Sequence, residues 1–363
     1  MSSPSDPNSS AQEGTGYESP SSAPLGALAP WFGGKRSLAP MIVRQCCFDG
    51  VRGKYRTPGW FGEPFCGSMA VSLAMPEVST HVVNDLHVGL TTLALVLASE
   101  HGPTLVSDLR DVLACESVFL AMCAEYQVAH PKVAAMGDGK GWAMGGDGRV
   151  NITDEHYQLA ISFAVREWLG PNGLAGTKHA DRFCKRYHAG GGDPAKRWRN
   201  VPESFELFMG KLRQFTILRE DAIGMIRKAL TVISETSRKA NDPFEVLYLD
   251  PPYLPETRTS GMYEHDFRDP DLFDSTDLHV ELAGLLTKPG TANRIVVSYY
   301  DHPRLDDLYP ADGGWHKLRR PVNKGVGNAS GSGVTQAFEA LLINEAPAPM
   351  TTHDIEAGWE QVR

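Results

Sequence analysis

Seven short apolar runs, separated by segments with helical spacing, constrain the fold of this chain more than any other feature. The runs cover residues 59–63, 80–84, 215–219, 245–249, 294–299, 315–320 and 336–343. Strands that alternate with helices build a largely parallel sheet with helices on its faces. The last two runs flank a glycine-rich stretch, 324–333, and predict an antiparallel hairpin at the edge of the sheet. The sequence therefore predicts an α/β fold.

Two helices of this fold can be placed from the side-chain pattern. Leucines recur at helical spacing at Leu86, Leu90, Leu93 and Leu97, and Asn84 or Asp85 stands where the helix cap belongs. Residues 277–286 predict a second helix.

One long segment breaks the alternation. Residues 99–210 contain helical patches and no convincing strand, so we expect a mainly helical insertion there. The main domain then comprises residues 27–98 and 211–344. Residues 1–26 are rich in Ser, Pro and Gly and predict a disordered tail. Residues 345–363 are expected to form a loosely attached C-terminal tail.

The charge of the chain limits how it can meet a nucleic acid. With 35 basic and 44 acidic residues the net charge is −9, which excludes a globally basic surface and leaves only a local patch. Residues 177–200 form such a patch, with seven Lys or Arg against two Asp. The candidate phosphate contacts are Lys178, Arg182, Lys185, Arg186, Arg197 and Arg199, with Phe183, Tyr187 and Trp198 interleaved for stacking on bases. A solvated surface helix is the alternative.

Other classes of protein are disfavoured by what the chain lacks. No apolar run approaches the roughly 18 residues of a membrane helix. The first basic residue is Lys35, whereas a secretory or transit peptide needs early positive charge. The six cysteines form no Cys-x-x-Cys pair, so we expect reduced thiols, no metal site and a cytoplasmic protein without membrane contact.

The strongest chemical signal is Asp250-Pro251-Pro252-Tyr253, which follows the apolar run at 246–249. It therefore lies at the carboxyl end of a strand, where open α/β sheets bind ligands. Two prolines stiffen the turn, so the Asp250 carboxylate and the Pro251 carbonyl form two fixed acceptors. Such a pair can bind both N–H groups of a planar amino group and activate its nitrogen for attack on a methyl sulfonium, while Tyr253 stacks on the base.

Two further motifs predict a binding site for the methyl donor. Residues 63–68, Glu-Pro-Phe-Cys-Gly-Ser, place Gly67 at a strand-to-helix turn, where a ligand can approach the backbone closely. Asp85 ends the next strand, 18 residues after Gly67 (85 − 67), near the spacing expected for an acid on a ribose hydroxyl. Residues 30–35, Pro-Trp-Phe-Gly-Gly-Lys, form a glycine-containing loop that presents Lys35 before a helix.

Taken in order, these motifs resemble the Dam-like (α-class) DNA adenine-N6 methyltransferases. The resemblance covers residues 30–100 and 200–345, and it extends to His279, Leu282 and Ala283 and to residues 298–301, Ser-Tyr-Tyr-Asp. It implies a Rossmann-like sheet that binds S-adenosyl-L-methionine, with a terminal hairpin, and an insertion that recognises double-stranded DNA. A monomer is expected, with a cognate restriction endonuclease as a further candidate partner.

The resemblance also assigns roles to individual positions. It places Trp31, Lys35, Phe65, Gly67, Asp85, Asp221 and Asp250 around the cofactor, with Lys35 near the methionine carboxylate, Asp85 on the ribose and Asp221 at the adenine ring. Catalysis falls to Asp250, Pro251, Pro252 and Tyr253. Two positions depart from the family pattern. Met69 replaces a second glycine, which predicts a weaker or differently shaped cofactor site, and Tyr299 replaces an asparagine.

Other activities remain as alternatives to adenine methylation in DNA. Cytosine-N4 enzymes more often carry Ser at the position of Asp250, and protein-glutamine methyltransferases more often carry Asn. An RNA adenine methyltransferase is a further alternative, as is a catalytically inactive DNA-binding protein on the same fold. A dinucleotide-dependent oxidoreductase is disfavoured because the chain has no Gly-x-Gly-x-x-Gly.

Overall fold

The structure is a computed structural model of the chain. It describes residues 26–136, 151–171, 182–185, 187, 193–237, 244–257, 277–288, 294–324 and 335–362. The predicted N-terminal tail, apart from Gly26, and the hairpin loop, apart from Lys324, lie outside the described residues.

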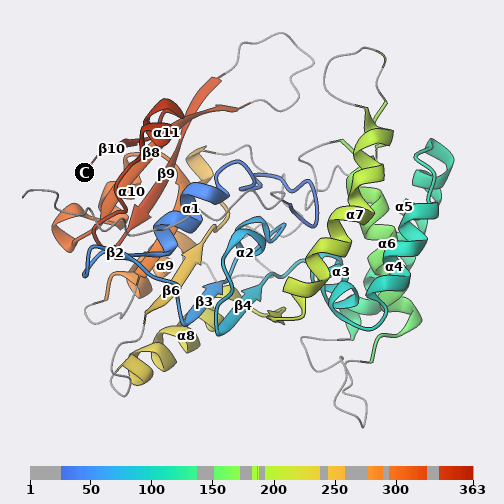
Figure 1. Ribbon diagram of the computed structural model, residues 1–363, viewed down its shortest axis with the longest axis horizontal. Helices are drawn as coiled ribbons and strands as arrows, with labels where there is room; N and C mark the ends of the chain where they lie inside the picture. The colour runs from blue at the N-terminus through green and yellow to red at the C-terminus, as the bar shows by residue number, and fades with distance from the viewer. Residues whose placement is uncertain are drawn as a thin grey trace, which may run out of the picture.

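A mixed sheet of eight strands forms the centre of the protein (Figure 1). Its strands are β3 (Trp60–Glu63), β4 (Thr80–Asn84), β5 (Phe215–Leu218), β6 (Glu245–Leu249), β7 (Arg294–Tyr300), β8 (His316–Lys324), β9 (Thr335–Ile343) and β10 (Glu360–Gln361). They lie in the order β10-β8-β9-β7-β6-β3-β4-β5. The five strands β7, β6, β3, β4 and β5 are parallel to one another, whereas β9 pairs antiparallel with β7 and with β8, and β8 pairs antiparallel with β10. The predicted α/β fold is confirmed at this level.

The strand order reverses next to β3. From β3 the chain moves outward through β4 to β5, and then returns to place β6 on the other side of β3. Open α/β sheets bind their ligands at such a reversal, outside the carboxyl ends of the strands. The motifs at residues 63–68 and 250–253 follow β3 and β6 directly, so the topology brings them to the same place.

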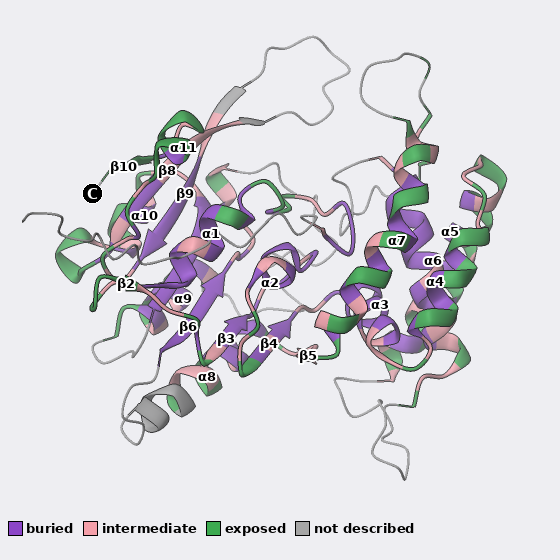
Figure 2. Ribbon diagram, viewed as in Figure 1, coloured by how far each residue is buried: buried purple, intermediate pink, exposed green. Residues whose placement is uncertain are grey.

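Both faces of the sheet are covered, which explains why its central strands are apolar throughout. In β6, Val246 and Tyr248 join the core beneath helices α1 (Ala39–Cys46) and α2 (Ala70–Ala74), whereas Leu247 and Leu249 join the core on the opposite face. Helices α8 (Ala222–Ser237), α9 (Leu278–Leu286) and α10 (Arg304–Leu308) cover that second face. Figure 2 shows the central strands buried along their length.

The predicted insertion is helical in its described residues. It comprises α4 (Gly102–Asp111), α5 (Glu116–Ala135), α6 (Asp154–Leu169) and α7 (Pro194–Leu212), and Figure 1 shows these helices gathered on one side of the protein. Their apolar faces share one core with α3 (Val88–Ala98), Met69 and Val83 of β4. The helical region is thus packed onto the parallel end of the sheet.

The two helices placed from the sequence are present, with one difference. Helix α9 covers Leu278–Leu286, close to the predicted bounds, and Asp277 caps it by accepting the backbone N–H of His279 at 2.9 Å. Helix α3 begins later than expected, and its cap is His87 rather than Asn84 or Asp85. The His87 ring accepts the backbone N–H of Leu90, while Asp85 accepts the backbone N–H groups of Gly67 and of His87 itself.

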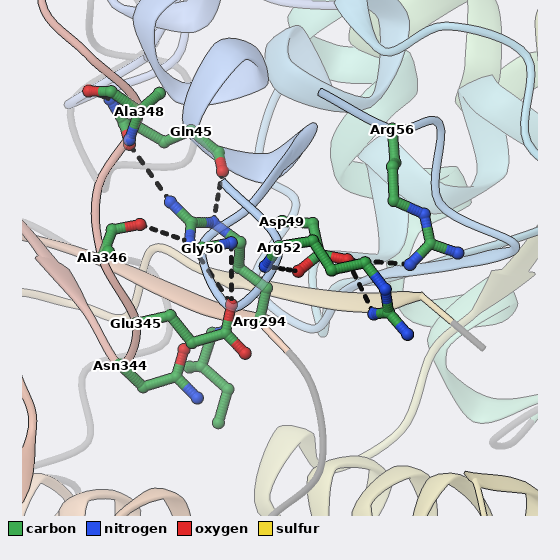
Figure 3. A network of polar contacts seen from close by, with 11 residues as sticks. Gln45, Asp49, Gly50, Arg52, Arg56, Arg294, Asn344, Glu345, Ala346 and Ala348 are labelled. Carbon is green, nitrogen blue, oxygen red and sulfur yellow. Dashed lines mark hydrogen bonds and ion pairs between the residues drawn. The ribbon is translucent and has the colours of Figure 1, made fainter. Parts of the chain in front are cut away.

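The C-terminal stretch corrects the sequence analysis, because residues 345–362 are not loosely attached. Ala348 donates its backbone N–H to Gln45 at 2.8 Å, and the buried Arg294 donates to the Ala346 carbonyl at 3.0 Å (Figure 3). Beyond α11 (Thr352–Glu356), Trp359 is 3% exposed and packs into the core beneath α1. Strand β10 then pairs with β8, so the hairpin does not form the outer edge of the sheet. A short hairpin, β1 (Phe48–Asp49) and β2 (Lys54–Tyr55), was also not predicted.

Candidate functional site

Lys35 and Asp250 form the centre of the candidate site. The Lys35 ammonium lies 2.9 Å from Asp250 Oδ2, and it donates to the Gly33 carbonyl at 2.7 Å. The Lys35 side chain is 6% exposed and that of Asp250 20% exposed. Burial raises the pKa of Asp250 above its ordinary value, and the Lys35 ammonium opposes this rise. The sequence assigned both residues to one pocket, and the structure places them in direct contact.

Tyr253 and Glu339 complete this group of charges. The Tyr253 hydroxyl donates a hydrogen bond to Glu339 Oε1, and the same oxygen lies 3.5 Å from the Lys35 ammonium. The Lys35 nitrogen also lies 4.9 Å from the centroid of the Tyr253 ring. Tyr253 is only 6% exposed, with the edge of Tyr300 packed against it, so its ring is largely covered. Glu339 belongs to β9, and no sequence motif pointed to it.

The second part of the site joins Gly67, Asp85 and Trp31. Gly67 has a positive φ of 43° and donates its backbone N–H to Asp85 Oδ2 at 2.8 Å. A Cβ atom on Gly67 would stand 2.9 Å from Trp31 Nε1, so only glycine fits beside the indole. The Trp31 ring meets His87 edge to face, with centroids 5.2 Å apart. Three residues predicted to surround the cofactor therefore lie together.

A fourth carboxyl group, that of Glu63, lies within electrostatic range of Asp250 and Asp85. Glu63 ends β3, is 2% exposed, and accepts hydrogen bonds from both the backbone N–H and the hydroxyl of Ser72. Burial raises the pKa of Glu63 to about 8, and the charge of Asp250 adds to this effect. Ser72 lies in α2, so Glu63 fixes the helix that follows the glycine turn. In the sequence, Glu63 stood out only as the first residue of the motif at 63–68.

Met69 adopts an unusual backbone conformation. Its φ of 58° makes it the only non-glycine residue with positive φ in the described part of the chain. It directly precedes α2, and its side chain is fully buried in the core shared with the helical region. Met69 thus has a left-handed backbone conformation at the position where the resembled family has a second glycine.

Two other predicted cofactor residues lie near the edge of this arrangement. Phe65 is partly buried and packs against the core beneath α8 and α9. Asp221 is exposed at the end of β5, and its carboxylate accepts the backbone N–H of Gly224 at 2.6 Å in the first turn of α8. In this structure Asp221 acts as a helix cap. Its predicted contact with an adenine ring stays a prediction.

The basic stretch at 177–200 is only partly a surface patch. Arg182, Lys185 and Arg199 are exposed, and Lys185 pairs with Glu116 at 2.6 Å. Arg197 instead donates to the carbonyls of Trp168 and Gly170, which end α6. Trp198 is 3% exposed and Phe183 packs against the core, so these rings are not open for stacking, unlike the exposed Tyr187. Lys178 and Arg186 lie outside the described residues.

Comparison with known proteins does not assign this chain to a family. No protein-family model matches it, and a search of the curated proteins finds no match. Within the described residues, no helix is both long enough and apolar enough to cross a membrane. Nor do the described residues hold a group of three His, Cys, Asp or Glu side chains arranged to bind a metal ion.

Proposed function

We propose that this protein transfers a methyl group from S-adenosyl-L-methionine to the N6 amino group of adenine in DNA. The observation that carries this proposal is the position of Asp250. It follows β6 at the reversal of strand order, paired with Lys35 and close to the glycine turn after β3. A planar amino group on the substrate has two N–H donors, which match two acceptors, the Asp250 carboxylate and the Pro251 carbonyl. A hydroxyl or thiol substrate has only one donor.

The residues of the glycine turn fit a nucleoside cofactor. Asp85 accepts backbone N–H groups from Gly67 at 2.8 Å and His87 at 2.9 Å. A carboxylate has about four lone-pair sites, so Asp85 retains capacity for ribose hydroxyls. The absence of a side chain on Gly67 keeps the turn narrow beside the Trp31 indole. When bound, S-adenosyl-L-methionine supplies a methyl group on a positively charged sulfur, and we expect Trp31, Phe65, Gly67 and Asp85 to hold it.

The chain's own part in the reaction is to bind and orient the amino group. In this proposal one oxygen of Asp250 and the Pro251 carbonyl accept the two N–H groups of adenine. Lys35 favours the ionised form of Asp250 and opposes the effect of burial, because a neighbouring cation stabilises the charged form of a carboxyl group. Asp250 and Glu339 are two carboxylates that share the single positive charge of Lys35, which leaves this group with a negative character that suits a sulfonium.

The partner we propose is double-stranded DNA with the target adenine turned out of the helix. An amino group inside a stacked base pair cannot reach a buried carboxylate, so extrusion is required, at a cost of a few kcal/mol. The helical region α4–α7 lies beside the β4–β5 end of the sheet and is the proposed target-recognition region. Its exposed basic residues Arg182, Lys185 and Arg199 are the proposed phosphate contacts.

Methylation of duplex DNA with labelled S-adenosyl-L-methionine, followed by methylation-aware sequencing, tests the proposal. The wild-type protein should label adenine at one short sequence, and Asp250→Ala should abolish labelling while circular dichroism shows an intact fold. Label on cytosine, or on RNA alone, would change the proposed substrate. Near wild-type turnover by Asp250→Ala would remove the reaction from this strand end.

A further inference from the structure

Glu339 occupies a position that the proposed reaction has not yet explained. It lies on β9, opposite Tyr300 of β7 on one side and Arg320 of β8 on the other. Its side chain is 5% exposed, in the interior of the sheet's antiparallel part. A buried carboxylate is costly unless cations or donors surround it. Glu339 meets this requirement with the same two side chains that contact Asp250.

One oxygen of Glu339 receives both interactions. The Tyr253 hydroxyl donates to Oε1, and the Lys35 ammonium lies 3.5 Å from the same atom. An ammonium group has three N–H donors. Around Lys35 stand three oxygens at contact distance, namely Gly33 O at 2.7 Å, Asp250 Oδ2 at 2.9 Å and Glu339 Oε1 at 3.5 Å. Two carboxylates therefore share one cation.

This sharing has a consequence for Asp250. If Lys35 paired with Asp250 alone, the carboxylate would be more fully neutralised and would be a weaker acceptor for an incoming amino group. Because Glu339 also pairs with the Lys35 ammonium, Lys35 neutralises Asp250 less completely. The hydrogen bond from Tyr253 fixes that anion, and it ties the last residue of the Asp-Pro-Pro-Tyr turn to β9.

We infer that Glu339 is a positioning residue for methyl transfer, which holds Lys35 and Tyr253 so that Asp250 remains a strong, oriented acceptor for the substrate amino group. The inference rests on the proposed function. It concerns a residue that touches neither the cofactor nor the base, so its effect should reach the reaction through Asp250.

The effect of Glu339 on Asp250 can be measured on the acid side of the pH–rate profile, where Asp250 becomes protonated and loses its acceptor. Charged and titratable groups face Asp250 from several elements: Lys35 before α1, Glu63 on β3, Tyr248 on β6, Tyr253 in the turn, Tyr299 and Tyr300 on β7, and Glu339 on β9. The charge of Asp250 raises the pKa of Glu339, and because repulsion between two anions is mutual, the Glu339 charge disfavours the ionised form of Asp250 in turn. Removing the Glu339 charge should therefore lower the pKa of Asp250 and move the acid limb to lower pH.

The test compares Glu339→Gln with Glu360→Gln. Glutamine keeps the size of the side chain and an acceptor for Tyr253, but it removes the charge. Glu360 is a matched control, because it pairs with Arg319 on the same sheet at an exposed position. We expect Glu339→Gln to lower kcat about ten- to hundredfold, the effect of a hydrogen bond to a charged group. KM for S-adenosyl-L-methionine should stay close to the wild-type value, and the acid limb should move to lower pH. Glu360→Gln should leave all three unchanged.

The outcomes separate the inference from the proposed function. A wild-type protein that methylates no nucleic acid overturns both. An active wild type with unchanged kcat in Glu339→Gln, or with lower kcat and an unmoved acid limb, overturns only the role of Glu339. If Glu339→Gln does not fold, Glu339→Asp decides, because the shorter side chain withdraws the carboxylate from Lys35 and Tyr253 and leaves the Tyr253 hydroxyl, which also bonds Asp250, in place. A tenfold or greater loss of kcat with unchanged cofactor KM supports the inference, and wild-type kcat overturns it.

Discussion

Gly67 and Asp85 are joined by a hydrogen bond of 2.8 Å between the Gly67 backbone N–H and Asp85 Oδ2. The two residues follow neighbouring parallel strands, β3 and β4. The bond therefore links the glycine turn to the end of the next strand and fixes the orientation of the carboxylate. The second oxygen, Oδ1, accepts the N–H of His87 at the start of α3. Asp85 is thus held in place before any ligand arrives.

Asp85→Ala tests this arrangement as a cofactor site. The variant should bind S-adenosyl-L-methionine more weakly by about 1.5–3 kcal/mol, the scale for a hydrogen bond to a charged group. Isothermal titration calorimetry measures the change. Asp193→Ala is the matched control, because Asp193 also accepts a backbone N–H, that of Ala195 at the start of α7, away from the glycine turn. Equal affinities in folded wild type and Asp85→Ala would exclude Asp85 from the site.

The sheet was predictable because its signals are local. A strand buried on both faces is a short apolar run, and each of the seven runs became a strand, with bounds that differ by a few residues at most. The helix predicted at residues 277–286 was found for the same reason, and the bond that caps it is also local, since Asp277 accepts the N–H of a residue two positions away. The assignment of Lys35 and Asp250 to one pocket required more, namely a motif order that resembles a known family, and their direct ion pair was not predicted.

Contacts between distant segments were not predictable. In the sequence, Glu339 is a single acidic residue within an apolar strand. Its contact with Tyr253 depends on the pairing of β9 with β7, which the local sequence does not show. Residues 345–362 have little helical or strand pattern, and they are held by contacts to Gln45, Arg294 and β8. The net charge of residues 177–200 likewise does not show which basic side chains face solvent. Arg197 is not one of them, because it donates to carbonyls at the end of α6.

The exposed basic residues predict a particular salt dependence of DNA binding. Reversing Arg182 and Lys185 to Glu should weaken binding and reduce the slope of log K against log salt by about 0.9 for each phosphate that these two side chains neutralise in the wild type. Fluorescence anisotropy at several salt concentrations measures the slope. Arg227 and Lys228 on α8, reversed to Glu, are the control with the same change in charge, since both are exposed on another helix. If both double variants have the same slope, these two residues of the patch do not bind DNA phosphates.

Glu63 should make stability depend on pH. Burial raises its pKa from the ordinary 4.5 to about 8, so the folded protein retains a proton that the unfolded chain releases. Stability is then greatest below pH 4.5 as far as this group is concerned, and it falls as pH rises to about 8. The loss is at most about 1.4 kcal/mol per pH unit.

Urea unfolding of Glu63→Gln at several pH values measures this contribution. The variant cannot ionise, so its free energy of unfolding should fall less than that of the wild type between pH 5 and pH 8. Glu77→Gln, at an exposed position, should follow the wild-type curve. Parallel curves for wild type and Glu63→Gln would mean that Glu63 has no such raised pKa.

The left-handed backbone at Met69 predicts that glycine is more stable than alanine at position 69, whereas alanine is more stable than glycine at position 70. Both Met69→Ala and Met69→Gly remove the buried side chain, but alanine keeps the Cβ atom that makes a φ of 58° unfavourable. We therefore expect Met69→Gly to be more stable than Met69→Ala by about 1 kcal/mol. At Ala70, the first residue of α2, the backbone is helical, so Ala70→Gly should be less stable than the wild type by about 1 kcal/mol. Chemical unfolding of the four proteins measures both differences. Greater stability of Met69→Ala than of Met69→Gly would show that the residue before α2 does not hold a left-handed conformation in solution.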